Sequence, residues 1–160
     1  ELLVSVLRAS PETSGVLFDL PHAIEGAKRH FEKAGLASRC EFLGGDFFKS
    51  VPSGADAYLL KSVIHDWDDE KSRVILENCR HAMAEGGRLL LVERVIPDRL
   101  EVSAAHQGVA RSDLTMLVAH AAHERTEAEF RDLLNSAGFH VTRILPVGMT
   151  FSVIEAFPLH

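Results

Sequence analysis

The sequence lacks any apolar run approaching the ~20 residues that a helix needs to cross a bilayer. It also lacks an opening segment with the charged and apolar parts of a secretory signal peptide. Cysteine is scarce: Cys40 and Cys79 are far apart, and each lies within an apolar pattern. We therefore expect reduced core thiols in a cytoplasmic protein that has no membrane span, disulfide framework or metal-binding cysteine motif.

Basic residues are outnumbered, with 17 Lys and Arg against 23 Asp and Glu and a net charge of −6. This balance excludes a protein that depends on contacts with a phosphate backbone, so we expect no nucleic-acid partner. The nine histidines do not show zinc-ligand spacing, and no metal site is expected. Phosphate-loop, CxxC, GxGxxG and serine-hydrolase signatures are also missing, which removes the usual sequence support for those chemistries.

Apolar residues are plentiful instead, at 46% of 160 residues, enough for one ordinary soluble domain with a core. The patterns predict strands that alternate with helices, and the strands are apolar on both faces. Such alternation is typical of an α/β fold with a parallel sheet covered by helices on both sides. The predicted strands are 15–20, 40–43, 56–61, 88–95, 140–146 and 150–157. The predicted helices are 1–10, 22–35, one from the acidic residues 66–70 to Gly86, 106–121 and 126–137.

Acidic residues follow the first two predicted strands. In doubly wound sheets, ligands bind beyond the carboxyl ends of the strands. Asp19 could accept hydrogen bonds from both hydroxyls of a ribose, or it could simply cap the helix that follows. Asp46 could accept from an adenine amino group while Phe47 packs on the ring, although Gly-Gly-Asp is also an ordinary tight turn.

The third predicted strand ends at Lys61, and His65 follows before an acidic helix start. That position suits a base, although a lone histidine is more often structural, and Trp67 beside it is expected in the core. On the helix itself, we expect a buried face made of Val74, Ile75, Cys79, Ala82 and Met83.

Two glutamates lie near later element ends. Glu93 follows an apolar strand, where an unpaired carboxylate is costly. Glu124 precedes Thr126 and Glu129, which match a capping box, so Glu124 could be no more than a solvated loop charge.

Five segments in order carry a resemblance to a known family. Together they resemble the S-adenosylmethionine (SAM)-dependent O-methyltransferases that include plant caffeate and flavonoid enzymes and bacterial polyketide and carotenoid relatives. The similarity implies an α/β, Rossmann-like methyltransferase sheet, mostly parallel with a last antiparallel strand. The segments are Phe18-Asp19-Leu20-Pro21-His22, Gly44-Gly45-Asp46-Phe47-Phe48, residues 60–70 with His65-Asp66-Trp67, Val92-Glu93, and Glu124-Arg125-Thr126 with Phe130.

The resemblance also implies a role for each site residue. The reaction it implies is transfer of a methyl group from SAM to a phenolic hydroxyl of a small molecule in secondary metabolism, without a metal. The implied cofactor contacts are Asp19 on the ribose, Asp46 and Phe47 on the adenine and Lys61 beside the methionyl part. The implied catalytic residues are His65 as general base with Glu93 and Glu124 orienting it, and the implied acceptor pocket includes Asp113, Met116 and His120.

The sequence departs from the family pattern at its start. The glycine-rich cofactor loop, the strand before it and the helical N-terminal dimerisation domain of a homodimer are missing. We therefore expect residues 1–160 to form a partial catalytic domain in which strands 15–20 and 56–61 each have an unpaired edge. Three alternatives stay open: a SAM-binding relative with altered chemistry (hydroxylation, decarboxylation or binding alone), a nucleotide-binding dehydrogenase, and a non-catalytic interaction module.

Overall fold

The computed structural model describes residues 1–99, 111, 118, 123–148 and 150–159. The chain divides into two compact units, Glu1–Pro52 and Ser53–His160. The predicted helix 106–121 falls almost wholly outside the described residues. None of the described helices is both long and apolar enough to span a membrane.

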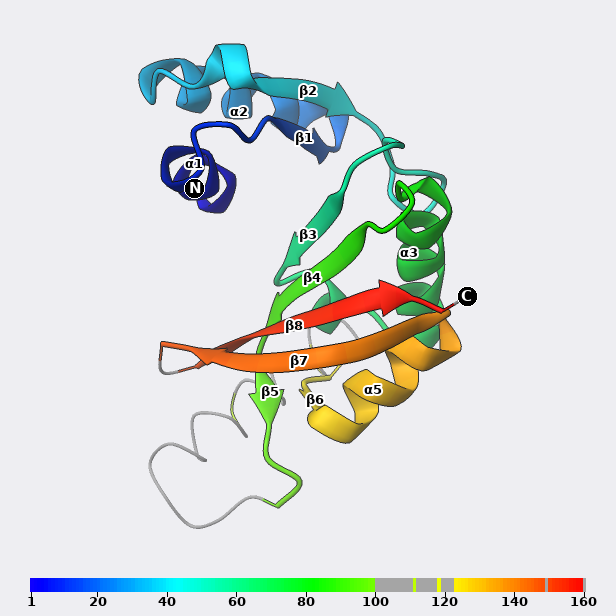
Figure 1. The fold of residues 1–160 in the computed structure, drawn as a ribbon. Coiled ribbons are helices and arrows are strands. Elements are labelled where there is room, and N and C mark those ends of the chain that lie inside the picture. The colour runs from blue at the N-terminus through cyan, green and yellow to red at the C-terminus, as the bar shows by residue number, and fades with distance from the viewer. Residues whose placement is uncertain (100–110, 112–117, 119–122, 149, 160) are drawn as a thin grey trace. The chain divides into compact units, whose positions relative to one another are not determined.

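The first unit contains α1 (Leu2–Ala9), β1 (Gly15–Asp19), α2 (Pro21–Lys33) and β2 (Cys40–Gly44), with a short 3-10 turn at Ala37–Arg39 (Figure 1). Strands β1 and β2 are parallel, and Asp19 lies opposite Gly44. A buried cluster joins the helices to β2 and consists of Val4, Leu7, Phe31, Leu36 and Cys40. These elements match the predicted strands and helices of residues 1–44.

Helix α2 has local signals at both ends. Pro21 occupies its first turn, where its fixed φ suits the helix and its missing N–H costs nothing. Gly35 follows the helix with a φ of +70°, and the Leu36 N–H donates to the Phe31 carbonyl at 3.0 Å. A glycine is favoured there because the left-handed conformation strains other residues.

The second unit is built on a four-stranded sheet of order β3-β4-β8-β7. Its strands are β3 (Ala57–Lys61), β4 (Arg88–Glu93), β7 (Phe139–Val147) and β8 (Phe151–Pro158). Strand β3 is parallel to β4, whereas β8 runs antiparallel to both β4 and β7. The predicted α/β class with an antiparallel last strand is therefore confirmed.

Helices α3 (Asp69–Ala82) and α5 (Glu127–Ser136) lie on one face of this sheet (Figure 1). On β4 the buried side chains are Leu89, Leu91 and Glu93, because alternate residues of a strand point to the same face. Their β8 partners opposite Leu89 and Leu91 are Ala156 and Ile154, which are also fully buried. The carboxylate of Glu93 thus belongs to the buried side of the strand.

The buried face of α3 differs from its prediction. Ile75 and Cys79 are buried as expected, but Ser72 and Leu76 complete the face, while Val74 is only half-buried. Ser72 can face the core because its hydroxyl donates to the buried Ile64 carbonyl, and a pattern of apolar residues does not detect such a position.

The edges and thiols agree with expectation. Among the described residues, β1 pairs with β2 alone and β3 pairs with β4 alone, so each keeps one edge without a strand partner. Cys40 and Cys79 are free and buried, and burial raises the pKa of the Cys79 thiol to about 12.

Candidate active site

The His65 turn connects β3 to α3. Ser62 begins it with a φ of +52°, a left-handed conformation that is uncommon for a residue other than glycine, and its N–H donates to the Val92 carbonyl at 3.1 Å. Residues Ile64–Asp66 then form a single 3-10 turn. Asp68 caps α3 by accepting from the Lys71 N–H at 2.8 Å, which fixes where the turn ends.

Glu93 supports this turn from the end of β4. Its side chain is 0% exposed, and Oε1 accepts hydrogen bonds from the backbone N–H groups of Val63 and Ile64, both at 2.9 Å. Oε1 of the buried carboxylate is therefore satisfied, whereas Oε2 has no hydrogen-bond partner among the described residues and lies 3.8 Å from His65 Nδ1. Burial raises the pKa of Glu93, against the opposing effects of His65 and the two N–H donors.

Glu124 reaches the same place from a distant part of the sequence. The short strands β5 (Val95–Ile96) and β6 (Arg125–Thr126) are parallel, and Val95 lies opposite Arg125. This pairing brings the residues before α5 beside the end of β4. Glu124 is only 2% exposed, and its Oε1 lies 3.5 Å from Arg94 Nη1. The alternative that Glu124 is a solvated loop charge is therefore wrong.

His65 lies between the two glutamates. Its Nδ1 is 3.8 Å from Glu93 Oε2 and 3.7 Å from Glu124 Oε2, and its side chain is 15% exposed. Its Nε2 lies 3.5 Å from Asp66 Oδ1. The contact with Glu124 is the main cause that raises the pKa of His65. Burial opposes it, and the charges of Glu93 and Asp66 add to it. This arrangement can hold a proton on an imidazole of increased basicity.

The two aspartates of the first unit lie at the carboxyl ends of neighbouring parallel strands, because Asp19 ends β1 and Asp46 follows β2. Asp19 Oδ1 accepts from the Leu20 N–H at 2.7 Å, next to the start of α2. Asp46 Oδ1 accepts from the Phe48 N–H at 3.0 Å, as in a tight turn. Leu20 is the N-cap residue of α2 and no side chain caps this helix, so the capping role considered for Asp19 is wrong, whereas the tight turn considered for Asp46 is present. The cofactor roles of both residues stay predictions.

The turn that carries Asp46 has little spare room. A Cβ on Gly45 would lie 2.4 Å from the ring of Phe18, so only glycine fits without a shift of that ring. Phe47 and Phe48 pack edge to face with centroids 4.9 Å apart. The turn therefore presents a carboxylate beside an aromatic pair.

Lys61, in the second unit, ends β3 with an exposed side chain. Its ammonium lies 5.5 Å from the centroid of Phe151, and the guanidinium of Arg94 lies 5.6 Å from the same ring. Among the other predicted site residues, Asp113, Met116 and His120 lie outside the described residues.

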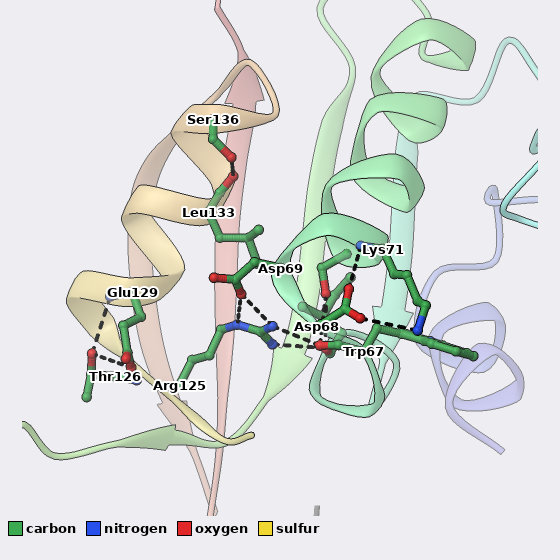
Figure 2. A network of polar contacts seen from close by, with 11 residues as sticks. Trp67, Asp68, Asp69, Lys71, Arg125, Thr126, Glu129, Leu133 and Ser136 are labelled. Atoms are coloured by element: carbon green, nitrogen blue, oxygen red, sulfur yellow. Dashed lines mark hydrogen bonds and ion pairs between the residues drawn. The ribbon is translucent and has the colours of Figure 1, made fainter. Parts of the chain in front are cut away.

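Sequence reasoning missed Arg125. Its side chain is 1% exposed, and it donates to backbone carbonyls on both sides of His65 and to Asp69, the first residue of α3 (Figure 2). An arginine beside a capping box resembles an ordinary surface charge, and no pattern within the sequence marks it as buried.

Residues 2–140 match the family model of the O-methyltransferase domain, and the chain belongs to this family. It is 44% identical to the phenazine O-methyltransferase PhzM of Lysobacter antibioticus, over 99% of this chain and 45% of that protein. It is 45% identical to the O-demethylpuromycin-O-methyltransferase of Streptomyces alboniger, over 99% of this chain and 42% of that protein. The chain thus spans less than half the length of these relatives.

A solved structure is also similar. It is that of NcsB1, an O-methyltransferase from neocarzinostatin biosynthesis, in complex with SAM and 2-hydroxy-5-methyl naphthoic acid. The match has a TM-score of 0.87 and 34% identity, and it covers 99% of this chain and 45% of that one.

Proposed function

We propose that the protein carrying this chain transfers a methyl group from SAM to a phenolic hydroxyl of an aromatic small molecule, with His65 as the general base. The observation that carries the proposal is the position of His65 Nδ1 between the buried carboxylates of Glu93 and Glu124. Family membership and the aromatic hydroxy acid bound to NcsB1 support the reaction type and the acceptor class.

A proton must leave the acceptor hydroxyl during this reaction. A phenol has a pKa near 10 and a free histidine about 6.5, so complete transfer is uphill by roughly 4.8 kcal/mol. Glu124, Glu93 and Asp66 favour the imidazolium and raise the pKa of His65, which reduces this difference. Carboxylates beside Nδ1 also favour a proton on that nitrogen, which leaves Nε2 of the neutral imidazole free to accept the proton of the hydroxyl.

For the cofactor, the residues of the first unit fit a nucleoside. Asp19 and Asp46 offer carboxylate oxygens at adjacent strand ends, where ribose hydroxyls and an adenine amino group are suitable donors. Phe47 offers a ring for the base. In the second unit, the exposed ammonium of Lys61 is proposed to bind the methionyl carboxylate. When bound, SAM supplies an electrophilic methyl group on a sulfonium, and no metal is part of this proposal.

The acceptor side and the assembly are proposals as well. We assign Asp113, Met116 and His120 to the acceptor pocket from the family pattern alone. We also propose a cytoplasmic homodimer that acts in secondary metabolism, in keeping with relatives whose names refer to phenazine and puromycin.

The test replaces His65 by Gln in the protein that carries this chain. Turnover with a methyl-labelled SAM and a panel of phenols should fall by about 10²- to 10⁴-fold, the usual contribution of a general base. The Kd for SAM, measured by calorimetry, should stay within about twofold, because His65 is not a proposed cofactor contact. The matched control is His140→Gln, which changes an exposed histidine on β7.

Two outcomes contradict the proposal. Unchanged turnover in His65→Gln would remove the base from the mechanism. An equal loss of turnover and SAM affinity would indicate that His65 supports the fold or the cofactor site instead.

A further inference from the structure

We propose that Arg125 is a positioning residue that ties the backbone of the His65 turn to Glu124 and so fixes the imidazole between its carboxylates. This inference rests on the proposed function for its catalytic meaning. Its physical content, the placement of His65, is independent of any reaction. None of the described contacts of Arg125 is with the imidazole, so its effect passes through the groups it holds.

The guanidinium of Arg125 is buried, and each of its three nitrogens donates at least one hydrogen bond. Nη1 donates to the Ile64 carbonyl at 2.9 Å, and Nη2 donates to the Trp67 carbonyl at 2.9 Å. Nε and Nη2 both donate to Asp69 Oδ1, at 3.0 and 2.8 Å. Figure 2 shows the guanidinium pointing from Arg125 toward Asp69 and Trp67. A buried cation is costly unless it is paired and hydrogen-bonded, and here Asp69 and two carbonyls meet that need.

The two carbonyls flank His65 in sequence. Ile64 immediately precedes the histidine, and Trp67 is the second residue after it. The N–H groups of Val63 and Ile64 are held from the other direction by Glu93 Oε1. Glu93 therefore holds the backbone N–H groups of the turn, and Arg125 holds its backbone carbonyls.

Arg125 also fixes Glu124, because the two residues are neighbours in the chain. The same guanidinium that binds the turn thus sets the distance between Glu124 Oε2 and His65 Nδ1, which is 3.7 Å. Ser72 Oγ gives weaker support to the same two carbonyls, at 3.3 Å each. A lysine at 125 would keep the charge but lack the planar fork that reaches several acceptors at once.

The charged groups around the imidazole define a readout that does not require turnover. Three carboxylates lie near the imidazole, those of Asp66, Glu93 and Glu124. Arg94 contacts Glu124, and Arg125 contacts Asp69 and the backbone of the His65 turn. If Arg125 holds Glu124 beside Nδ1, its loss should lower the pKa of His65 toward the ordinary value of about 6.5. A residue that only stabilised the fold would leave this pKa unchanged in the folded protein.

The experiment compares Arg125→Lys with the wild-type protein. The pKa of His65 is measured by NMR with histidine labelled at its ring nitrogens, and kcat and the Kd for SAM are measured in parallel. We expect a lower pKa, a kcat reduced by about 10- to 100-fold, and a SAM Kd within about twofold, because small misplacements near reacting groups are costly. The control is Arg131→Lys, an exposed arginine on α5 that pairs with Glu127.

A second variant, Arg125→Ala, is tested for rescue. Added guanidinium ion should restore part of kcat and of the His65 pKa by occupying the vacated position. If Arg125→Ala fails to fold, Arg125→Lys alone decides the question.

The outcomes separate the two proposals. A lowered His65 pKa in a protein whose wild type transfers no methyl group would support the positioning role and contradict the proposed function. An active wild type whose Arg125→Lys variant keeps both its kcat and its His65 pKa would overturn the positioning role alone.

Discussion

The acidic side chains of the two units are held in different ways. In the first unit, Asp19 and Asp46 bond backbone N–H groups one and two residues ahead, and both remain at least partly accessible to solvent. In the second, Glu93 binds N–H groups 29 and 30 residues away, and both Glu93 and Glu124 are buried against His65. Local bonding leaves carboxylates that a ligand can reach, whereas long-range burial produces carboxylates that change the pKa of a neighbour.

The largest expected effects come from substituting one acidic residue in each unit and comparing kcat with the Kd for SAM. Glu124→Gln should lower kcat by about 100-fold, because it removes the charge that favours the imidazolium, while the SAM Kd stays within about twofold. Asp19→Asn should do the opposite, raising the SAM Kd by about 10- to 100-fold through loss of a charged hydrogen-bond acceptor, with little change in kcat at saturation. Calorimetry and saturating kinetics provide the two measurements.

Asp132→Asn, an exposed change on α5, is the control for both variants. If Glu124→Gln and Asp19→Asn both changed kcat, or both changed the SAM Kd, the proposed division of roles between buried and accessible acids would be wrong.

The pH dependence sharpens the comparison further. Because the pKa of His65 is raised and the neutral imidazole is the base, kcat should rise with pH through a midpoint above about 6.5. Glu124→Gln should lower this midpoint most, since Glu124 is the main cause of the shift, and Glu93→Gln should lower it less. Profiles of kcat against pH for the three proteins give the order. If the midpoint did not change in either variant, the group that titrates in the kcat profile would not be His65.

The smallest effect concerns a local contact inside the second unit. Thr126 and Glu129 form the predicted capping box, in which the Glu129 N–H donates to Thr126 Oγ1 and the Thr126 N–H donates to Glu129 Oε2. Thr126→Ala should lower the free energy of unfolding by about 1 kcal/mol, the usual cost of a lost cap, without changing kcat. Urea denaturation checks the stability, and Ser136→Ala at the other end of α5 is the comparison. A loss of kcat would mean that the cap also positions its neighbour Arg125.

The features that were predictable are those with signals close together in the sequence. Pro21, Gly35 and the Thr126–Glu129 pair each mark a helix end within a few residues, and the structure confirms all three. The approach of His65 to Glu93 could also be predicted, since both residues follow strand ends, and the ends of neighbouring parallel strands meet at one edge of a sheet.

The remaining features depend on contacts that leave no local trace. Glu124 is buried because β5 and β6, two residues each, happen to pair, and strands this short have no recognisable period. Arg125 and Ser72 bind backbone carbonyls, which every residue possesses, so no side-chain pattern identifies their partners. Their burial follows from the assembled fold and could not be predicted from composition or spacing.

The left-handed conformation of Ser62 and the hydrogen-bonded backbone that follows it restrict insertions and deletions in the His65 turn. From Ser62 to Trp67, three N–H groups and two carbonyls are bound to β4 and to Arg125, and Asp68 then starts α3. An inserted or deleted residue here would rotate or displace His65 relative to every partner at once. At the exposed turn of Ser53 and Gly54, the Gly54 N–H donates to the Ala82 carbonyl at 2.8 Å, but no proposed site residue depends on this bond. Natural or engineered insertions should therefore be tolerated better there than between 62 and 68.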